Sequence, residues 1–169
     1  TDDFVSVPHH ASLDLTNSFT LEAWIYPSSL TGRRRVISRQ TGGGYLFGTD
    51  GDELRFTTSG VRDYLTTTVN ITVINAWYHI AVVMDASSDA QFYLDGVFKE
   101  TIVGTTPATA TTSVLNIGKN SSSEFFLGQI DEIKIWNTER SPSQFSLLKD
   151  NELNGTETGL VAYYKFSDG

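Results

Sequence analysis

The sequence contains no cysteine, only one methionine and four prolines, and no apolar run close to the length of a membrane span. Without cysteine, a disulfide framework and thiolate catalysis are excluded, and tetrahedral zinc sites lose their most common ligand. A helix needs about 20 apolar residues to cross a bilayer, so no membrane partner is expected. The histidines His9, His10 and His79 form no His-x-x-x-His pair, which gives little basis for histidine-based catalysis.

Positive charge is also scarce, and it is concentrated in one segment. The chain has 12 Lys and Arg residues against 20 Asp and Glu residues, for a formal net charge of −8. Such a chain repels the phosphates of nucleic acid, which is therefore not expected as a partner. Residues 33–62 are the exception, because six arginines stand there against three carboxylates. This segment is the natural place to look for an anionic ligand.

The residues that are abundant favour β-structure. The sequence has 17 Ser, 21 Thr, 10 Phe, 7 Tyr and 3 Trp, a composition typical of strands and unlike that of a disordered chain. A length of 169 residues suits one domain with its own core. We therefore expect a single domain over residues 1–169. Because strand-like sequence starts almost at the first residue and ends almost at the last, we expect this domain to be a module of a larger protein.

Twelve short strand-like runs follow one another, separated by turn residues, with one helical segment near the end. The predicted strands cover residues 4–7, 19–26, 35–38, 45–49, 54–58, 64–68, 78–85, 91–94, 97–100, 114–117, 125–136 and 160–166. Asp95-Gly96 is a strong hairpin signal, since a two-residue type I′ turn needs positive φ at both positions. The helix is expected from Ser141, as N-cap, to about Asn151, with Pro142 in the first turn and Gln144 completing a capping box. This order predicts an all-β fold, an antiparallel β-sandwich jelly roll with one short helix near the C-terminus.

Several segments, in this order, match one family. They are Asp3 to Pro8 with Phe19 to Ile25, Trp77 to Asp85, Phe92 to Gly96, and Ile117-Gly118 with Phe126 to Asn137. The pattern resembles the laminin-G-like, concanavalin A-like lectin/glucanase jelly-roll superfamily, in the branch often attached to secreted bacterial polysaccharide-degrading enzymes and adhesins. The resemblance implies the jelly-roll fold, a secreted or cell-surface location, tethering to other domains, and carbohydrate binding as the commonest role.

The resemblance also provides a test for catalysis, and the sequence fails it. Jelly-roll glucanases carry a Glu-x-Asp-x-(x)-Glu strand whose carboxylates act as nucleophile and general acid. The nearest match here runs from Gln129 to Lys134, with Asp131 at the central position. Both catalytic positions are replaced, one by Gln129 and the other by Lys134 or Ile133. We therefore predict that the domain is not an enzyme.

A structural Ca²⁺ is expected from the same resemblance, since related modules place a carboxylate on this strand and Ca²⁺ takes six to eight oxygen ligands. Asp131 is the leading candidate ligand, and Asp2 or Asp3 would join it if the first strand lies beside the strand of Asp131. The alternative is that Asp131 is an ordinary surface or capping carboxylate.

For the ligand site, the tryptophans Trp24, Trp77 and Trp136 lie within the family's recurring motifs and are assigned to the core. Anionic sugars suit arginine, whose planar fork binds carboxylate or sulfate through two hydrogen bonds. The predicted ligand-binding residues therefore lie in the segment 33–64 and are Arg33, Arg35, Arg39, Tyr45, Arg55, Arg62 and Tyr64. The competing interpretation is a basic edge strand that resists pairing with other chains.

The sequence thus predicts a non-catalytic carbohydrate-binding module, with an anionic polysaccharide as the favoured ligand. The alternative is a structural or protein-adhesion spacer domain without a glycan site.

Overall fold

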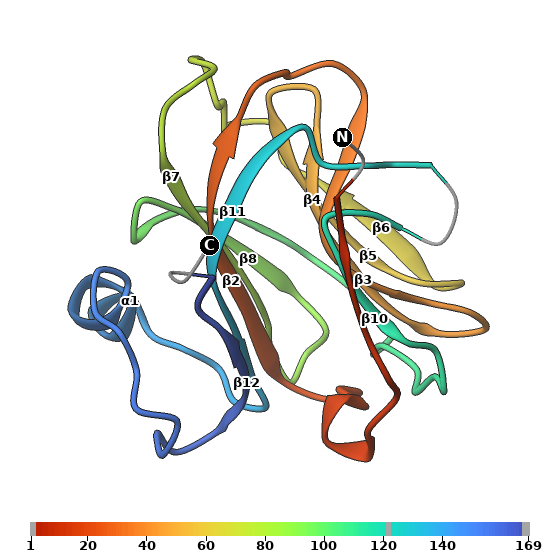
Figure 1. Cartoon of the computed structure of the whole chain (residues 1–169). Helices are drawn as coiled ribbons and strands as arrows, with labels where there is room; N and C mark the ends of the chain where they lie inside the picture. The colour runs from red at the N-terminus through yellow and green to blue at the C-terminus, as the bar shows by residue number, and fades with distance from the viewer. Residues whose placement is uncertain (1–2, 121–122, 167–169) are drawn as a thin grey trace.

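Two six-stranded antiparallel β-sheets pack face to face (Figure 1) in the computed structural model, which describes residues 3–120 and 123–166. Sheet 1 has the strand order β1-β10-β3-β4-β5-β6, and sheet 2 has the order β12-β11-β2-β7-β8-β9. In Figure 1, sheet 2 lies on the left, sheet 1 on the right, and helix α1 outside sheet 2. The architecture confirms the predicted all-β jelly-roll sandwich.

Each of the twelve predicted strands is present, with boundaries that differ by a few residues. Sheet 1 consists of β1 (Val5–Val7), β10 (Leu115–Ile117), β3 (Arg33–Gln40), β4 (Gly44–Asp50), β5 (Glu53–Thr58) and β6 (Arg62–Leu65). Sheet 2 consists of β12 (Leu160–Tyr164), β11 (Gly128–Trp136), β2 (Phe19–Pro27), β7 (Tyr78–Met84), β8 (Ala90–Leu94) and β9 (Val97–Ile102). A short 3₁₀ helix, η1 (Ala11–Leu13), joins β1 to β2 and is the one element without a sequence prediction.

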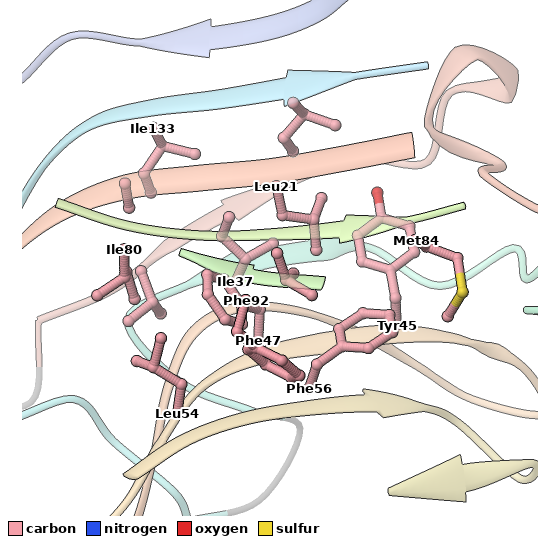
Figure 2. Packing of buried hydrophobic residues seen from close by; sticks show 14 of the residues in the cluster. Leu21, Ile37, Tyr45, Phe47, Leu54, Phe56, Ile80, Met84, Phe92 and Ile133 are labelled. Atoms are coloured by element: carbon pink, nitrogen blue, oxygen red, sulfur yellow. The ribbon is translucent and has the colours of Figure 1, made fainter. Parts of the chain in front are cut away.

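The core lies between the sheets and follows the two-residue period of the strands. In β2, Leu21 and Ile25 point inward and are completely buried, while Trp24 points to the outer face. Figure 2 shows Leu21 among the apolar side chains of the two sheets, which include Phe47 and Phe56. Each fully buried side chain of this size stabilises the fold by roughly 1.5–3 kcal/mol.

A β-bulge interrupts the two-residue period in β3. Arg35 pairs with Gly48, and the next pair is Ile37 with Phe47, so Val36 is an extra residue with no partner of its own. A bulge of this kind shifts the alternation by one residue. As a result, Arg33 and Arg35, which precede the bulge, face outward. Ile37 and Arg39, which follow it, face the interior.

Helix α1 (Pro142–Leu148) covers part of the outer face of sheet 2. Ser141 and Gln144 form the predicted capping box, and the proline occupies the first turn. The aromatic ring of Phe145 packs on that of Tyr93, with 4.7 Å between ring centroids, in a cluster completed by Ala81 and Val83. The helix therefore provides the second layer that lets β7 and β8 be apolar on both faces.

Charged side chains are buried between sheet 2 and the segment that contains α1. His79 Nε2 lies 2.9 Å from Glu22 Oε2, and the indole of Trp136 donates a hydrogen bond to Glu22 Oε1 at 2.5 Å. The ammonium of Lys134 donates to the carbonyl of Leu148 at 3.0 Å. Lys134 thus ties sheet 2 to the end of the helix, and the contacts of Glu22 join β2 to β7 and β11 beneath it.

Candidate functional site

Three of the seven predicted ligand-binding residues meet on the outer face of sheet 1. Arg33, Arg35 and Arg55 line a cavity of about 230 Å³, which we call the arginine pocket. Its other lining residues are Gln40, Leu46, Thr57, Ser59, Gly60, Asp63, Asn120 and Glu124. Arg33 and Arg35 lie on this face because successive side chains of a strand alternate between the two faces of the sheet.

Carboxylates already neutralise these arginines. Arg35 Nε donates to Glu124 Oε2 at 2.6 Å, and a backbone hydrogen bond from the Arg35 amide to the Glu124 carbonyl fixes the two residues side by side. Arg55 lies 2.9 Å from Asp50 and 2.5 Å from Asp63 through different nitrogens. Three arginines thus lie among three carboxylates, of which Asp63 and Glu124 line the pocket and Asp50 lies beside it.

Burial removes three other predicted residues from this surface. Arg39, Tyr45 and Tyr64 are each 0% exposed, and all three point toward the interior of the sandwich. The bulge at Val36 explains the burial of Arg39, because without the extra residue the Arg39 side chain would lie on the outer face with that of Arg35.

Arg39 has a structural environment there. Its guanidinium donates to the carbonyl oxygens of Thr111 and Ser113, at 2.7 and 3.2 Å, and to the carbonyl of Leu13. It also pairs with Asp14 at 2.9 Å. The remaining predicted residue, Arg62, lies at the edge strand β6, where its guanidinium sits 5.0 Å from the ring centroid of Tyr64.

A larger cavity, of about 410 Å³, lies on the outer face of sheet 2 beside the end of α1. Two tryptophans, Trp24 and Trp77, line it together with five charged residues and an asparagine. The polar lining residues are Asp131, Glu132, Lys149, Asp150, Asn151 and Glu152. We call this cavity the tryptophan groove.

The assignment of all three tryptophans to the core is therefore wrong for two of them. Trp136 is completely buried, as predicted. Trp77 is 42% exposed and lies in the loop just before β7, where its ring contacts that of Tyr26 with 5.5 Å between centroids. Trp24 is half-buried. The alternation of β2 places Trp24 and Tyr26 on the face opposite Ala23, and this is the sequence signal that identifies them as surface aromatics.

The groove is held in shape by hydrogen bonds from neighbouring elements. Trp24 Nε1 donates to the carbonyl of Lys149 at 2.8 Å, which ties the ring to the end of α1. Glu132 adopts a left-handed backbone conformation, with φ of 50°, at a bulge in β11. Its carboxylate accepts hydrogen bonds from the hydroxyl of Tyr163 at 2.6 and 2.7 Å. Burial of Tyr163, together with this contact to Glu132, raises the pKa of the Tyr163 hydroxyl.

Asp3 and Asp131, two of the aspartates predicted to bind calcium, line different cavities, and the third, Asp2, lies outside the described residues. Asp3 lines an apolar cavity beside β1, in sheet 1, whereas Asp131 lies on β11 in sheet 2 and lines the tryptophan groove. The condition that the two strands are neighbours is not met. Over residues 3–120 and 123–166, no group of three or more His, Asp or Glu side chains is arranged to hold a metal ion.

The paired antiparallel sheets and their strand order define a jelly-roll β-sandwich. The family model of the concanavalin A-like lectin/glucanases superfamily matches residues 1–146. The chain therefore belongs to this superfamily, as the sequence motifs predicted.

Solved structures with the same fold include carbohydrate-related proteins. A "putative carbohydrate binding protein" from Bacteroides ovatus superposes with a TM-score of 0.77 at 22% identity, over 96% of this chain and 48% of that one. Domain 4 of AbnA, a GH43 extracellular arabinanase from Geobacillus stearothermophilus solved with arabinotriose, superposes with a TM-score of 0.71 at 21% identity, over 86% and 71%. A pentraxin from Limulus polyphemus gives 0.61 at 15% identity, over 85% and 79%.

These similarities establish the fold. The chain spans about half the length of the Bacteroides ovatus protein. A comparison with curated protein sequences gives no match. Within the described part of the chain, no helix is both long enough and apolar enough to cross a membrane.

Proposed function

We propose that the domain is a non-catalytic carbohydrate-binding module that holds a glycan chain in the tryptophan groove. The observation that carries the proposal is the position of Trp77, a large aromatic side chain with 42% exposure, at the mouth of a cavity lined by carboxylates and an amide. Ligand sites typically combine apolar surface of this kind with a few polar groups that fix orientation.

The groove suits a neutral sugar. The C–H faces of sugar rings stack on aromatic rings, and Trp77 offers such a face to solvent. Carboxylates accept hydrogen bonds from hydroxyl groups, and Asp131 and Asp150 lie along the groove. Four carboxylates and one ammonium, that of Lys149, line the groove. This excess of negative charge disfavours an anionic glycan.

The anionic polysaccharide expected from the sequence would instead bind among the arginines of sheet 1. The charge balance of the arginine pocket argues against that ligand, because Asp50, Asp63 and Glu124 already pair with the guanidinium groups. A neutral polysaccharide is therefore the ligand class that we propose.

The same proposal places the domain in a secreted or cell-surface protein, as a module attached to a polysaccharide-degrading enzyme or an adhesin. It is supported by the similarity to a domain of an extracellular arabinanase and by the share of the Bacteroides ovatus protein that the chain spans.

Affinity electrophoresis in gels that contain arabinan, xylan, galactan, mixed-linkage glucan, pectate or alginate tests the function. We expect retardation by at least one neutral polymer and a loss of about tenfold or more in affinity for Trp77→Ala. Phe98→Ala is the matched control, since Phe98 is 46% exposed on the edge strand β9 and does not line the groove.

Equal binding by the Trp77→Ala variant and the wild-type protein would remove the groove from the proposal. Retardation by none of the polymers would favour the spacer domain. Both variants change exposed side chains, so we expect thermal midpoints close to that of the wild-type protein.

A structural Ca²⁺ at Asp131 is a separate proposal that rests on the strand pattern. A ligand that binds only the folded state raises its stability by mass action, so the thermal midpoint should rise with added calcium and fall with chelator. Identical melting curves under the two conditions would reject a stabilising ion. Asp131→Asn is expected to abolish the response, with Asp3→Asn as the comparison.

A further inference from the structure

The arginine pocket contains buried polar atoms that nothing in the protein satisfies. Within the part of the chain that the structure describes, Arg35 Nη1, Arg55 Nε and Gln40 Oε1 have no hydrogen-bond partner. Arg35 and Arg55 are 3% and 6% exposed, and all three side chains line the pocket. Leaving such an atom unpaired is unfavourable, so a ligand that pairs these atoms gains hydrogen bonds that the free protein lacks.

The strand register separates the two guanidinium groups and leaves space between them. Gly48 pairs with Arg35 on one side and with Arg55 on the other, and all three positions belong to the outer face of sheet 1. Glycine is needed at this position, because a Cβ there would collide with the backbone carbonyl of Arg34. The space between the arginines is the cavity that both side chains line. The apolar side chain of Leu46, which is 1% exposed, lines the same pocket.

The chemistry of the unpaired atoms restricts the ligand. Two of them are donors and one is an acceptor. A carboxylate or a sulfate accepts hydrogen bonds only, so it leaves Gln40 Oε1 unpaired and meets the charges of Glu124 and Asp63. A sugar hydroxyl both accepts and donates, which matches the set.

The volume restricts the ligand further. About 230 Å³ is less than the roughly 300–1,000 Å³ typical of drug-sized ligands. The volume of one sugar ring is of this order, whereas a glycan chain that continues in both directions would not fit.

We propose that the arginine pocket is a second carbohydrate site, which binds one neutral sugar unit at the end or branch of a glycan. Hydroxyl groups accept from Arg35 Nη1 and Arg55 Nε and donate to Gln40 Oε1, and a C–H face of the ring contacts Leu46. The site lies on the sheet opposite the tryptophan groove and does not depend on it.

The test is a titration of the ¹⁵N-labelled protein observed by NMR, because the Nε–H group of Arg55 has its own signal and lacks a partner in the free protein. The neutral probes are the methyl glycosides of arabinose, galactose, mannose and glucose. The anionic probes are glucuronate and inorganic sulfate. We expect at least one neutral glycoside to shift the Arg55 Nε–H signal, with little dependence on salt.

Two variants make the geometry falsifiable. Gln40→Met removes the unpaired acceptor at similar size, so we expect about fivefold weaker binding with no loss of stability. Arg55→Lys keeps the positive charge beside Asp50 and Asp63 but removes Nε, and should weaken binding similarly. Arg62→Lys is the matched control, since Arg62 does not line the pocket, and should bind as the wild-type protein does.

The proposal is overturned if no neutral glycoside shifts the Arg55 signal, if only the anions do, or if Gln40→Met binds as tightly as the wild-type protein. The indole N–H signals of Trp24 and Trp77 report on the groove in the same spectra. A failure of either site is therefore seen separately from the other.

Discussion

On the outer face of sheet 1, charged side chains pair with partners at the same surface and leave a pocket between them. On the outer face of sheet 2, charged side chains lie beneath the segment that contains helix α1. Arg55 on sheet 1 pairs with Asp63, whose side chain is 53% exposed, whereas Glu22 on sheet 2 pairs with His79 and both are at most 2% exposed.

This difference separates structural charges from charges that are available to a ligand. Beneath α1, Glu22 accepts from His79 and Trp136, which joins three strands of sheet 2, and Lys134 donates to the carbonyl of Leu148, which ties the end of the helix to the sheet. In the arginine pocket, Arg35 and Arg55 each retain a buried nitrogen without a partner among the described residues, as His79 does at Nδ1 beneath α1. The difference is that the two arginines line a cavity of about 230 Å³, whereas Glu22 and His79 are both at most 2% exposed.

The largest expected effect that tests this comparison is a change in the free energy of unfolding. We expect Glu22→Ala to lower the free energy of unfolding by about 3–5 kcal/mol, because His79 and Trp136 stay buried without their acceptor. Asp63→Ala on sheet 1 is the matched change and should cost less than about 1 kcal/mol, since the Asp63 side chain is 53% exposed and Asp50 still pairs with Arg55. Urea denaturation measures both, and equal losses would break the comparison.

A smaller effect is expected at alkaline pH. Burial raises the pKa of Tyr45, on sheet 1, above the ordinary value of 10.0. The stability linked to this proton is fully present below pH 10 and is lost as the pH rises above it, because the unfolded chain ionises first. The slope from one such group is at most about 1.4 kcal/mol per pH unit.

Tyr45→Phe should therefore reduce the loss of stability above pH 10, as measured by denaturation at several pH values. The pKa of Tyr163, on sheet 2, is also raised, so Tyr163→Phe serves as the comparison. An unchanged alkaline slope in Tyr45→Phe would show that the hydroxyl of Tyr45 is not the group that titrates late.

Most of the fold was predictable, because strand alternation and turn residues act locally. The helix cap at Ser141 and Gln144 formed as predicted, since a capping box depends on four consecutive residues. The Asp95-Gly96 turn between β8 and β9 formed for the same reason. These features need no information from distant parts of the chain.

The site was only partly predictable, because its geometry depends on residues far apart in the sequence. Arg35 meets Glu124 across 89 positions, and this pairing cancels the charge on which the prediction of an anionic ligand was based. The exposure of Trp77 depends on its place just outside β7, which a family motif does not reveal. The two-residue period of β2 did contain the signal for Trp24.

Val36 has the effect on β3 that a one-letter insertion has on a reading frame. Each side chain of β3 after Val36 lies on the face opposite to the one that it would occupy without this residue. Ile37 is therefore in the core, and Arg39 lies among buried carbonyl groups. When this strand is aligned with a strand that lacks such a bulge, a one-residue gap at position 36 decides which arginines correspond. Arginines in relatives should accordingly be matched by the face of the sheet that they occupy and not by their position in the sequence.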